Sequence, residues 1–236
     1  MKNKSLISIH DITKKDYDRV IELAEKFEKK PRQNILSEYV ISTLFFEPST
    51  RTRLSFESAA SYLGAKVIGF TDAATSSVKK GESLKDTVLT VSSYSDLIIM
   101  RHPKEGSARY ASEVSPVPII NAGDGANQHP TQCLLDLFSI KKTQKKLDGL
   151  QIAFVGDLKY GRTVHSLVQA LTNYTTTFHL VSPPELKLPS SVKQYIKDAN
   201  LEYYQYDEMD DVIPKVDILY MTRIQQERFS DPLEYE

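Results

Sequence analysis

The sequence predicts an α/β protein of two consecutive doubly wound domains, each with a mainly parallel sheet. Short apolar runs alternate with helical stretches, which is typical of βαβ units. The 236 residues suffice for one large domain or two small ones at roughly 150 residues per domain. The polar, basic stretch 141–149 (KKTQKKLDG) separates two sets of elements. We therefore expect domains over 1–142 and 149–236, with a linking helix near 130–142.

The first element expected is a helix near 14–29. Thr13 and Asp16 have the spacing of a capping box, and apolar residues follow at helical intervals. A buried strand is expected over 39–46, because that stretch is β-branched and aromatic, and Pro48 ends it.

The next helix is expected over 49–63, closed by Gly64. The pattern then repeats. Further strands are expected at 66–70, 96–100, 117–121, 151–155, 177–181 and 217–220. Helices are expected between most of them, at 82–94, 106–114, 130–142, 162–173 and 189–199.

The second domain is expected to be incomplete. It has about three predicted strands, fewer than the usual 4–6 of a sheet. The last residues, 231–236, begin with Asp-Pro, which is typical of the start of a helix rather than of a finished terminus. We therefore expect the sequence to be a fragment of a longer protein.

Composition excludes several functional classes. Thirty basic and 31 acidic side chains give a net charge of −1, which argues against a nucleic-acid binder. Cys133 is the only cysteine, so no intrachain disulfide forms and nothing indicates secretion. The start lacks a signal peptide, and no run reaches the ~18 apolar residues of a membrane span. We expect a cytoplasmic protein without membrane contact, and no metal site, because His and Cys lack metal-ligand spacing.

The first candidate site is the stretch 46–53 (FEPSTRTR), between a predicted strand and a predicted helix. Its hydroxyls, the N–H groups at the helix start and the Arg51 guanidinium all donate hydrogen bonds. Open α/β sheets bind ligands at the carboxyl ends of strands, so this stretch predicts a phosphate site. The alternative is that Ser49 only caps the helix and the arginines are surface residues.

Two more candidates follow later strands of the first half. Arg101 comes at the carboxyl end of a strand and could join the anion site. The stretch 123–132 (GDGANQHPTQ) runs through a turn into a helix, where His129 could donate to a carbonyl oxygen and Gln132 could accept from an amide. The alternatives are a surface arginine and a structural histidine.

Two loops carry further charges. The loop 76–83 holds two lysines before a helix, and by itself it favours a solvated loop. The loop 156–163 (GDLKYGRT) has the glycine spacing of a nucleotide phosphate loop, but Arg162 stands where lysine belongs. Nucleotide binding is therefore disfavoured, whereas Arg162 suits a carboxylate.

Arg223 and Gln225 follow the last predicted strand. They are two residues apart, so in an extended segment they point the same way. Such a pair could hold a carboxylate, and the alternative is a charged turn. Anion-binding groups thus follow strands in both halves, which fits a phosphate on one domain and a carboxylate on the other, across a cleft.

The motifs resemble those of the carbamoyltransferases. The stretch 46–57 (FEPSTRTRLSFE) is similar to the phosphate motif of that family, and 129–132 (HPTQ) to its second signature. The loop 76–81 resembles the mobile lysine loop, and 156–165 and 222–228 resemble aspartate-binding segments. The resemblance covers essentially the whole chain, and within the family it is to the aspartate-specific branch.

The resemblance implies a carbamoyltransferase-like fold and a reaction between carbamoyl phosphate and L-aspartate, an early step of pyrimidine synthesis. It implies catalytic roles for Arg51, Thr52, Arg101 and His129, and carbamoyl-phosphate binding by these four with Ser49, Thr50, Gln132, Ser76 and Lys80. It implies aspartate binding by Lys80, Arg162, Arg223 and Gln225. Ser76 and Lys80 would act from a neighbouring chain, which implies a homotrimer. No cofactor is implied.

The resemblance leaves alternatives open. Ornithine-specific relatives carry a Ser-Met-Gly loop that this chain lacks, but a carbamoyltransferase for another amino acid is a second hypothesis. A third is a truncated, non-catalytic chain that binds anions or partners, because family chains continue through a His-Pro-Leu-Pro-Arg element and final helices. A nucleotide-binding switch is a distant fourth. Whether regulatory chains attach is open.

Overall fold

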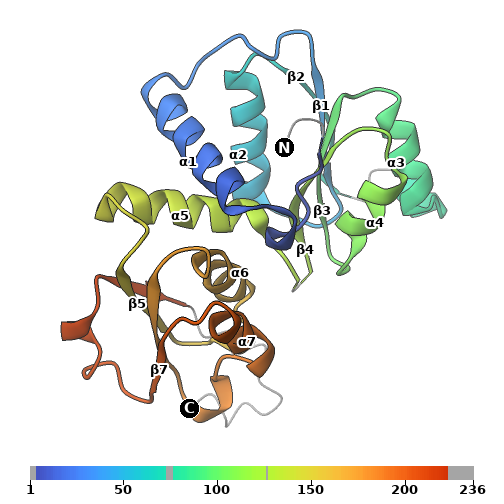
Figure 1. Cartoon of the computed structure of the whole chain (residues 1–236). Coiled ribbons are helices and arrows are strands. Elements are labelled where there is room, and N and C mark those ends of the chain that lie inside the picture. Colours follow the sequence, from blue (N-terminus) through green and yellow to red (C-terminus); the bar gives the residue numbers. More distant parts are fainter. Residues whose placement is uncertain (1–3, 73–76, 126, 223–236) are drawn as a thin grey trace. The chain divides into compact units, whose positions relative to one another are not determined.

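The computed structural model describes residues 4–72, 77–125 and 127–222. The chain divides into two compact units, 1–135 and 136–236, and each forms its own parallel sheet (Figure 1). Helix α5 (Pro130–Gln144) runs from the first unit into the second. In the described ranges, no helix combines the length and the apolar character that a membrane crossing requires.

The first unit is a four-stranded sheet in the order β2-β1-β3-β4, and all strands are parallel. The strands are β1 (Val40–Phe45), β2 (Lys66–Phe70), β3 (Leu97–His102) and β4 (Ile119–Asp124). The helices are α1 (Lys14–Lys29), α2 (Thr50–Tyr62), α3 (Leu84–Ser92) and α4 (Ser107–Val114). Figure 1 shows α1 and α2 on one side of the sheet and α3 and α4 on the other.

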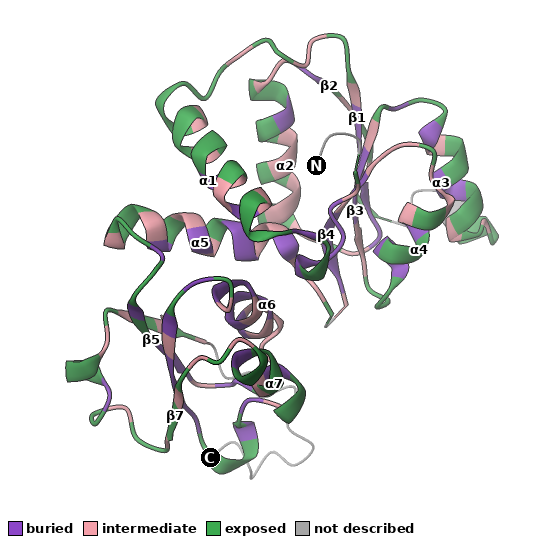
Figure 2. Ribbon diagram, in the orientation of Figure 1, coloured by how far each residue is buried: buried purple, intermediate pink, exposed green. Residues whose placement is uncertain are grey.

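Alternation along the strands gives each face of this sheet its own core. Phe45 on β1 packs with Ala60 of α2 on one face. Its neighbour Leu44 packs on the other face with Val88 of α3 and Ala111 of α4. The strands are therefore buried where the helices cover them (Figure 2).

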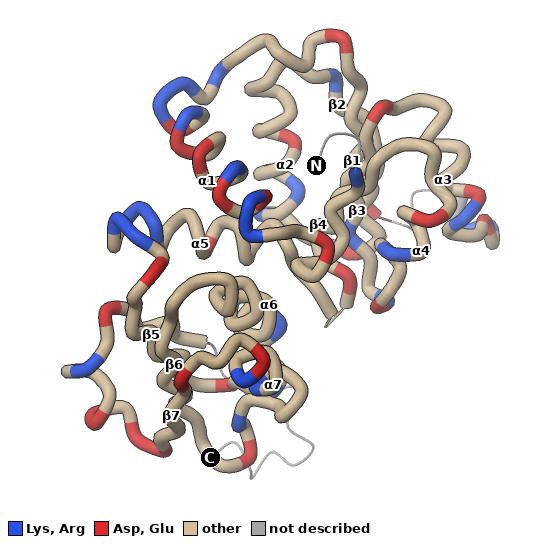
Figure 3. The backbone as a smooth tube through the Cα atoms, viewed as in Figure 1, with Lys and Arg blue, Asp and Glu red and all other residues tan. Residues whose placement is uncertain are grey.

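Helix α1 begins and ends where the sequence predicts. Thr13 and Asp16 form the expected capping box, and the hydrogen bond from the Thr13 backbone lowers the pKa of Asp16. Tyr17 is buried and donates from its hydroxyl to the Ile9 carbonyl at 3.1 Å. The exposed side of α1 carries charges of both signs (Figure 3).

The second unit is also a parallel sheet, in the order β7-β6-β5-β8. The strands are β5 (Leu150–Val155), β6 (Thr176–Val181), β7 (Tyr203–Tyr206) and β8 (Ile218–Met221). Helices α6 (Arg162–Leu171) and α7 (Ser190–Asp198) lie together beside this sheet (Figure 1). Val212, from the connection between β7 and β8, packs with Ala153 and Val181.

The structure confirms two parallel sheets with alternating helices, and most expected elements lie within three residues of their predicted bounds. The expectation of three strands in the second half is wrong, because β7 is a fourth. Its sequence, YYQY, shows no apolar run, and at the sheet edge its residues are exposed or half-buried. The helix start expected at 231–236 lies outside the described residues.

Candidate active site

The start of α2 lies directly after β1, at the carboxyl edge of the first sheet. Ser49 is the N-cap residue, but its side chain makes no capping hydrogen bond. The first N–H groups of an α-helix have no partner within the helix. Because Ser49 does not cap them, they can donate hydrogen bonds to a ligand. Arg53 instead forms an ion pair with Glu57 at 3.3 Å, and of the two arginines Arg51 is the one left to line a pocket.

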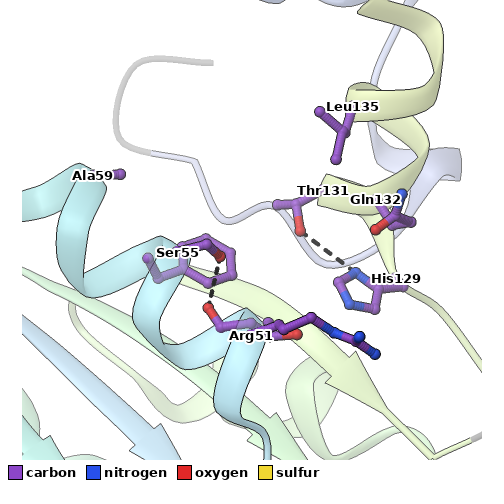
Figure 4. A pocket seen from close by; sticks show the side chains of 9 residues that line it. Arg51, Ser55, Ala59, His129, Thr131, Gln132 and Leu135 are labelled. Carbon is purple, nitrogen blue, oxygen red and sulfur yellow. Dashed lines mark hydrogen bonds between the residues drawn. The ribbon is translucent and has the colours of Figure 1, made fainter. Parts of the chain in front are cut away.

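That pocket has a volume of about 520 Å³ and lies between α2 and the start of α5 (Figure 4). Its polar lining residues are Arg51, Thr52, Ser55, His129, Thr131 and Gln132. Phe56, Ala59 and Leu135 add apolar surface. In Figure 4 the Arg51 side chain extends beneath the ring of His129. The pocket is thus lined by a cation, several hydroxyls, an imidazole and an amide. Such a lining suits a small ligand that carries both an anionic group and a neutral polar group.

Arg101, near the end of β3, is fixed by an ion pair. Its Nε donates to Glu47 Oε1 at 2.6 Å, and the two side chains are 16% and 27% exposed. A charge-assisted bond of this length holds a side chain more firmly than a neutral one. The ion pair therefore fixes the orientation of the guanidinium, and the Nη groups remain able to donate hydrogen bonds to a ligand.

Gly123 lets Arg101 and His129 approach the same place. A Cβ atom on Gly123 would lie 3.4 Å from Arg101 Nη1 and 3.6 Å from His129 Cδ2. The φ angle of Gly123 is +121°, a conformation that favours glycine. The Arg101 guanidinium and the His129 ring consequently both lie close to a residue without a side chain.

His129 stands at the entry to α5, where Pro130 occupies the first helical position. The His129 carbonyl accepts from the backbone N–H of Gln132 at 3.1 Å and of Cys133 at 3.3 Å. Its Nδ1 lies 3.5 Å from Thr131 Oγ1 (Figure 4). The turn thus ties the ring and the Gln132 amide to one helix start, so both line the same pocket.

His102 follows Arg101 in the chain but serves the framework. Its Nδ1 lies 3.0 Å from the Lys104 backbone N–H and 2.9 Å from Ser107 Oγ. Burial, with a smaller effect from the charge of Lys104, lowers the pKa of His102. The neutral ring accepts these bonds and joins the end of β3 to the start of α4.

At the carboxyl edge of the second sheet, Arg162 is the first residue of α6. The preceding loop does not resemble a nucleotide cradle in its bonding. The buried Asp157 carboxylate accepts from the Tyr160 N–H at 2.9 Å, and the Leu158 N–H donates to the Leu186 carbonyl at 3.1 Å. A phosphate loop needs its N–H groups for the ligand, so this bonding disfavours nucleotide binding.

His165 lies one turn into α6. Its Nε2 is 2.8 Å from the Leu158 carbonyl, and burial lowers the pKa of the ring. The end of β8 lies against the same loop, because a Cβ on Gly156 would come within 2.6 Å of Thr222 Oγ1. Thr222 immediately precedes Arg223, which with Gln225 lies outside the described residues.

The structure brings together part of the predicted site. Arg51, Thr52, His129 and Gln132 line one pocket, Ser49 and Thr50 begin the same helix, and Arg101 reaches Gly123 beside His129. Lys80 ends a short 3-10 turn (Ser77–Lys80), is exposed, and does not line the pocket. Ser76 lies outside the described residues.

Sequence reasoning placed Glu47 and Gly123 within candidate stretches but gave neither a role, and it missed the pocket-lining face of α2. The last had a signal, because Arg51, Ser55 and Ala59 recur every four residues and so share one face. The Glu47–Arg101 pair joins residues 54 positions apart, and no local pattern marks such a pair. In the described ranges, no group of three or more His, Cys, Asp or Glu side chains could hold a metal ion.

Two family models match the chain in succession. Residues 4–142 match the carbamoyl-P binding domain of aspartate/ornithine carbamoyltransferases, and residues 148–234 match their Asp/Orn binding domain. The first match contains the whole pocket between α2 and α5.

Sequence and structure comparisons agree with the family models. The chain is 57% identical to an aspartate carbamoyltransferase catalytic subunit from Phocaeicola vulgatus, over all of this chain and 76% of that protein. The catalytic subunit of M. jannaschii aspartate transcarbamoylase matches with a TM-score of 0.91 and 52% identity, over 98% of this chain and 78% of that one. An aspartate transcarbamoylase from Trypanosoma cruzi, in complex with aspartate and phosphate, matches with a TM-score of 0.89 and 39% identity, over 97% of this chain and 77% of that one. The chain belongs to the aspartate/ornithine carbamoyltransferase family.

Proposed function

We propose that this chain transfers the carbamoyl group of carbamoyl phosphate to the amine of L-aspartate, which gives N-carbamoyl-L-aspartate and phosphate. The observation that carries the proposal is the pocket where Arg51, Thr52, His129 and Gln132 meet. The relatives named as aspartate carbamoyltransferase catalytic subunits support aspartate as the acceptor. The product belongs to an early step of pyrimidine synthesis.

The start of α2 receives the phosphate. Its unpaired N–H groups and the partial positive charge of the helix end attract a dianion. The hydroxyls of Ser49, Thr50 and Thr52 add donors at the same end, and Arg51 supplies a full charge and a two-pronged donor. As the bond to phosphate breaks, charge builds on the departing oxygen, and Arg51 stabilises it.

The carbamoyl end lies toward Arg101 and His129. Attack by an amine on the carbamoyl carbon turns the carbonyl oxygen into an oxyanion. Thr52, Arg101 and His129 donate to that oxygen, and Gln132 accepts from the carbamoyl nitrogen. Fixed donors aimed at a developing charge are commonly the largest single contribution to rate. The ion pair with Glu47 keeps Arg101 from having to reorganise during the reaction.

The second unit binds the acceptor, aspartate. Arg162 binds a carboxylate of aspartate at the start of α6, together with Arg223, Gln225 and Lys80. The three cations among them suit a dicarboxylic amino acid and repel the ammonium of ornithine. Catalysis then consists of positioning and electrostatics, and the departing phosphate takes the proton of the aspartate amine. No covalent intermediate is involved.

The proposal extends to the assembly. Ser76 and Lys80 would complete the site of a neighbouring chain, so the active form would be a homotrimer in the cytoplasm. Lys80 does not line the pocket of its own unit, which supports a role in trans. The M. jannaschii relative is described as a catalytic subunit. Co-purification would show whether regulatory chains bind to this chain.

An assay of the purified chain tests this function. Carbamoyl phosphate labelled with ¹⁴C at the carbamoyl carbon is supplied with L-aspartate or with L-ornithine. We expect labelled N-carbamoyl-L-aspartate and no citrulline. Labelled citrulline would move the acceptor to ornithine, and no acid-stable product from either amine would contradict a transferase.

A further inference from the structure

Asp124, at the end of β4, is a charged side chain that the proposed reaction does not use. It is 1% exposed, and burial of a carboxylate is costly unless hydrogen bonds fill its lone pairs. Oδ1 accepts from Asn121 Nδ2 at 2.9 Å and from the Gln128 backbone N–H at 3.1 Å. Oδ2 accepts from the Gly106 N–H and from Asn127 Nδ2, both at 3.0 Å.

Two of these four bonds, those from Asn127 and Gln128, reach the turn that carries His129. Gln128, whose N–H is held by Asp124, immediately precedes His129. The backbone closes the same turn, because the Asn127 N–H donates to the Asp124 carbonyl at 3.1 Å. The position of the imidazole therefore depends on a carboxylate that does not itself line the pocket.

The backbone of the same turn is joined to the strand that carries Arg101, and the Asp124 carboxylate joins the turn to the start of α4. The Gly125 N–H donates to the His102 carbonyl at 3.0 Å, one residue beyond Arg101. Gly106, bound by Asp124 Oδ2, is the N-cap residue of α4. Asn121 is locked as well, because Nδ2 also donates to the Ile7 carbonyl and Oδ1 accepts from the Gly123 N–H.

We propose that Asp124 is a positioning residue, which sets His129 against Arg101 through the backbone of Gln128 and so shapes the carbamoyl end of the pocket. The inference rests on the proposed function, which gives His129 and Gln132 the carbamoyl group. The phosphate end is built separately on α2, so Asp124 affects recognition of one half of the donor and not of the other.

The substitution Asp124→Asn separates these halves. An amide has only one acceptor oxygen, and its NH₂ group must face two of the four donors that the carboxylate satisfied. Two of the four donors then lose their partner and the turn shifts. Asn127→Ala is a milder second variant, because it removes one of the four bonds from an exposed side chain.

Asp96→Asn is the matched control. Asp96 is also an aspartate of the first unit, and its Oδ2 accepts from the Val40 N–H at 2.8 Å. It precedes β3, so it lies at the amino edge of the sheet, opposite the pocket. It is exposed, and its loss leaves the turn before His129 in place.

Calorimetric titration of the full chain with inorganic phosphate and with phosphonoacetamide, a stable compound with both a phosphonate and a carboxamide, tests the proposal. We expect wild type and Asp96→Asn to prefer phosphonoacetamide. In Asp124→Asn that preference falls about tenfold, while the Kd for phosphate changes less than about twofold. The His129 ring signals in an NMR spectrum shift in Asp124→Asn and not in Asp96→Asn.

The outcomes separate the two levels of the proposal. A wild-type chain that binds both compounds equally contradicts the proposed function, and the role of Asp124 falls with it. A wild-type chain with the preference and a folded Asp124→Asn that keeps it overturn the positioning role alone. If Asp124→Asn does not fold, Asn127→Ala decides: a two- to threefold loss of preference (about half a kcal/mol) supports the role, and an unchanged preference overturns it.

Discussion

The carboxyl edges of the two sheets carry different kinds of site. At the edge of the first sheet, Arg101 is fixed by Glu47 at 2.6 Å, and His129 begins a helix that faces Arg51 across a pocket. At the edge of the second sheet, Arg162 begins α6. In the loop before it, the Asp157 carboxylate and the Leu158 N–H already make hydrogen bonds within the protein.

A two-substrate reaction can be divided between two domains in this way. The first unit carries several donors for one small anion, held by the Arg101–Glu47 ion pair and by helix starts before any ligand arrives, which is the arrangement that electrostatic catalysis requires. In the proposed function, the second unit contributes charges that select the acceptor. Substitutions at the first edge should therefore affect turnover, and those at the second edge should affect the KM for aspartate.

The largest effect is expected from Arg101→Ala. It removes one donor to the oxyanion, and losses of this kind cost about 100- to 1,000-fold in kcat. Steady-state kinetics at saturating aspartate measure it. Arg109→Ala is the matched control, because Arg109 is an exposed arginine in an ion pair with Asp11, and it should keep wild-type kcat. A kcat for Arg101→Ala within threefold of wild type would remove Arg101 from the catalytic set.

Arg162→Ala should affect the other substrate. Loss of a charged partner of a carboxylate costs about 1.5–3 kcal/mol, so the KM for aspartate should rise about 10- to 100-fold. The Kd for phosphate, measured by titration, should stay at the wild-type value, because α2 is intact. A change in phosphate affinity with an unchanged KM for aspartate would reverse the division between the two edges.

A smaller effect is expected from Glu47→Ala. Arg101 keeps its charge but loses the bond that orients it, so kcat should fall about tenfold, less than for Arg101→Ala. The double variant should be no slower than Arg101→Ala alone, because Glu47 acts through Arg101. Multiplication of the two losses would show that Glu47 acts independently.

The smallest effect concerns pH. Burial lowers the pKa of His102, as it does for His165 and His179. Below the usual histidine pKa of about 6.5, the unfolded chain then binds more protons than the folded chain, and stability falls as the pH falls toward the folded-state pKa values. His102→Asn keeps an acceptor near the Nδ1 position and does not titrate in this range.

Urea unfolding at pH 7.5 and pH 5.5 measures this effect. Wild type should lose stability between the two, and His102→Asn should lose less, by under about 1 kcal/mol. Equal losses in the two proteins would contradict a neutral, half-buried His102.

Local signals in the sequence account for much of the fold. The capping box at Thr13 and the glycine after α2 mark helix ends through bonds between near neighbours. The apolar run of β1 likewise predicts a buried strand. Strand β7 has neither signal, because its pairing with β6 at the sheet edge needs no apolar run.

The site residues likewise differ in whether the local sequence indicates them. Arg51, His129 and Gln132 sit in local strand-to-helix stretches, so the sequence alone indicates them. The roles of Glu47 and Gly123 depend on contacts made across the sheet. Such contacts become visible only once the strand order β2-β1-β3-β4 is known, because it brings the ends of β1, β3 and β4 together.

The most direct test of the account is a calorimetric titration of the chain with N-(phosphonacetyl)-L-aspartate, which joins a phosphonate to aspartate and needs no turnover. We expect tight binding by wild type, loss of binding in Arg51→Ala and weaker binding in Arg162→Ala. Equal affinity in all three proteins, or no binding by a folded wild-type chain, would contradict the claim that one chain carries groups for both substrates.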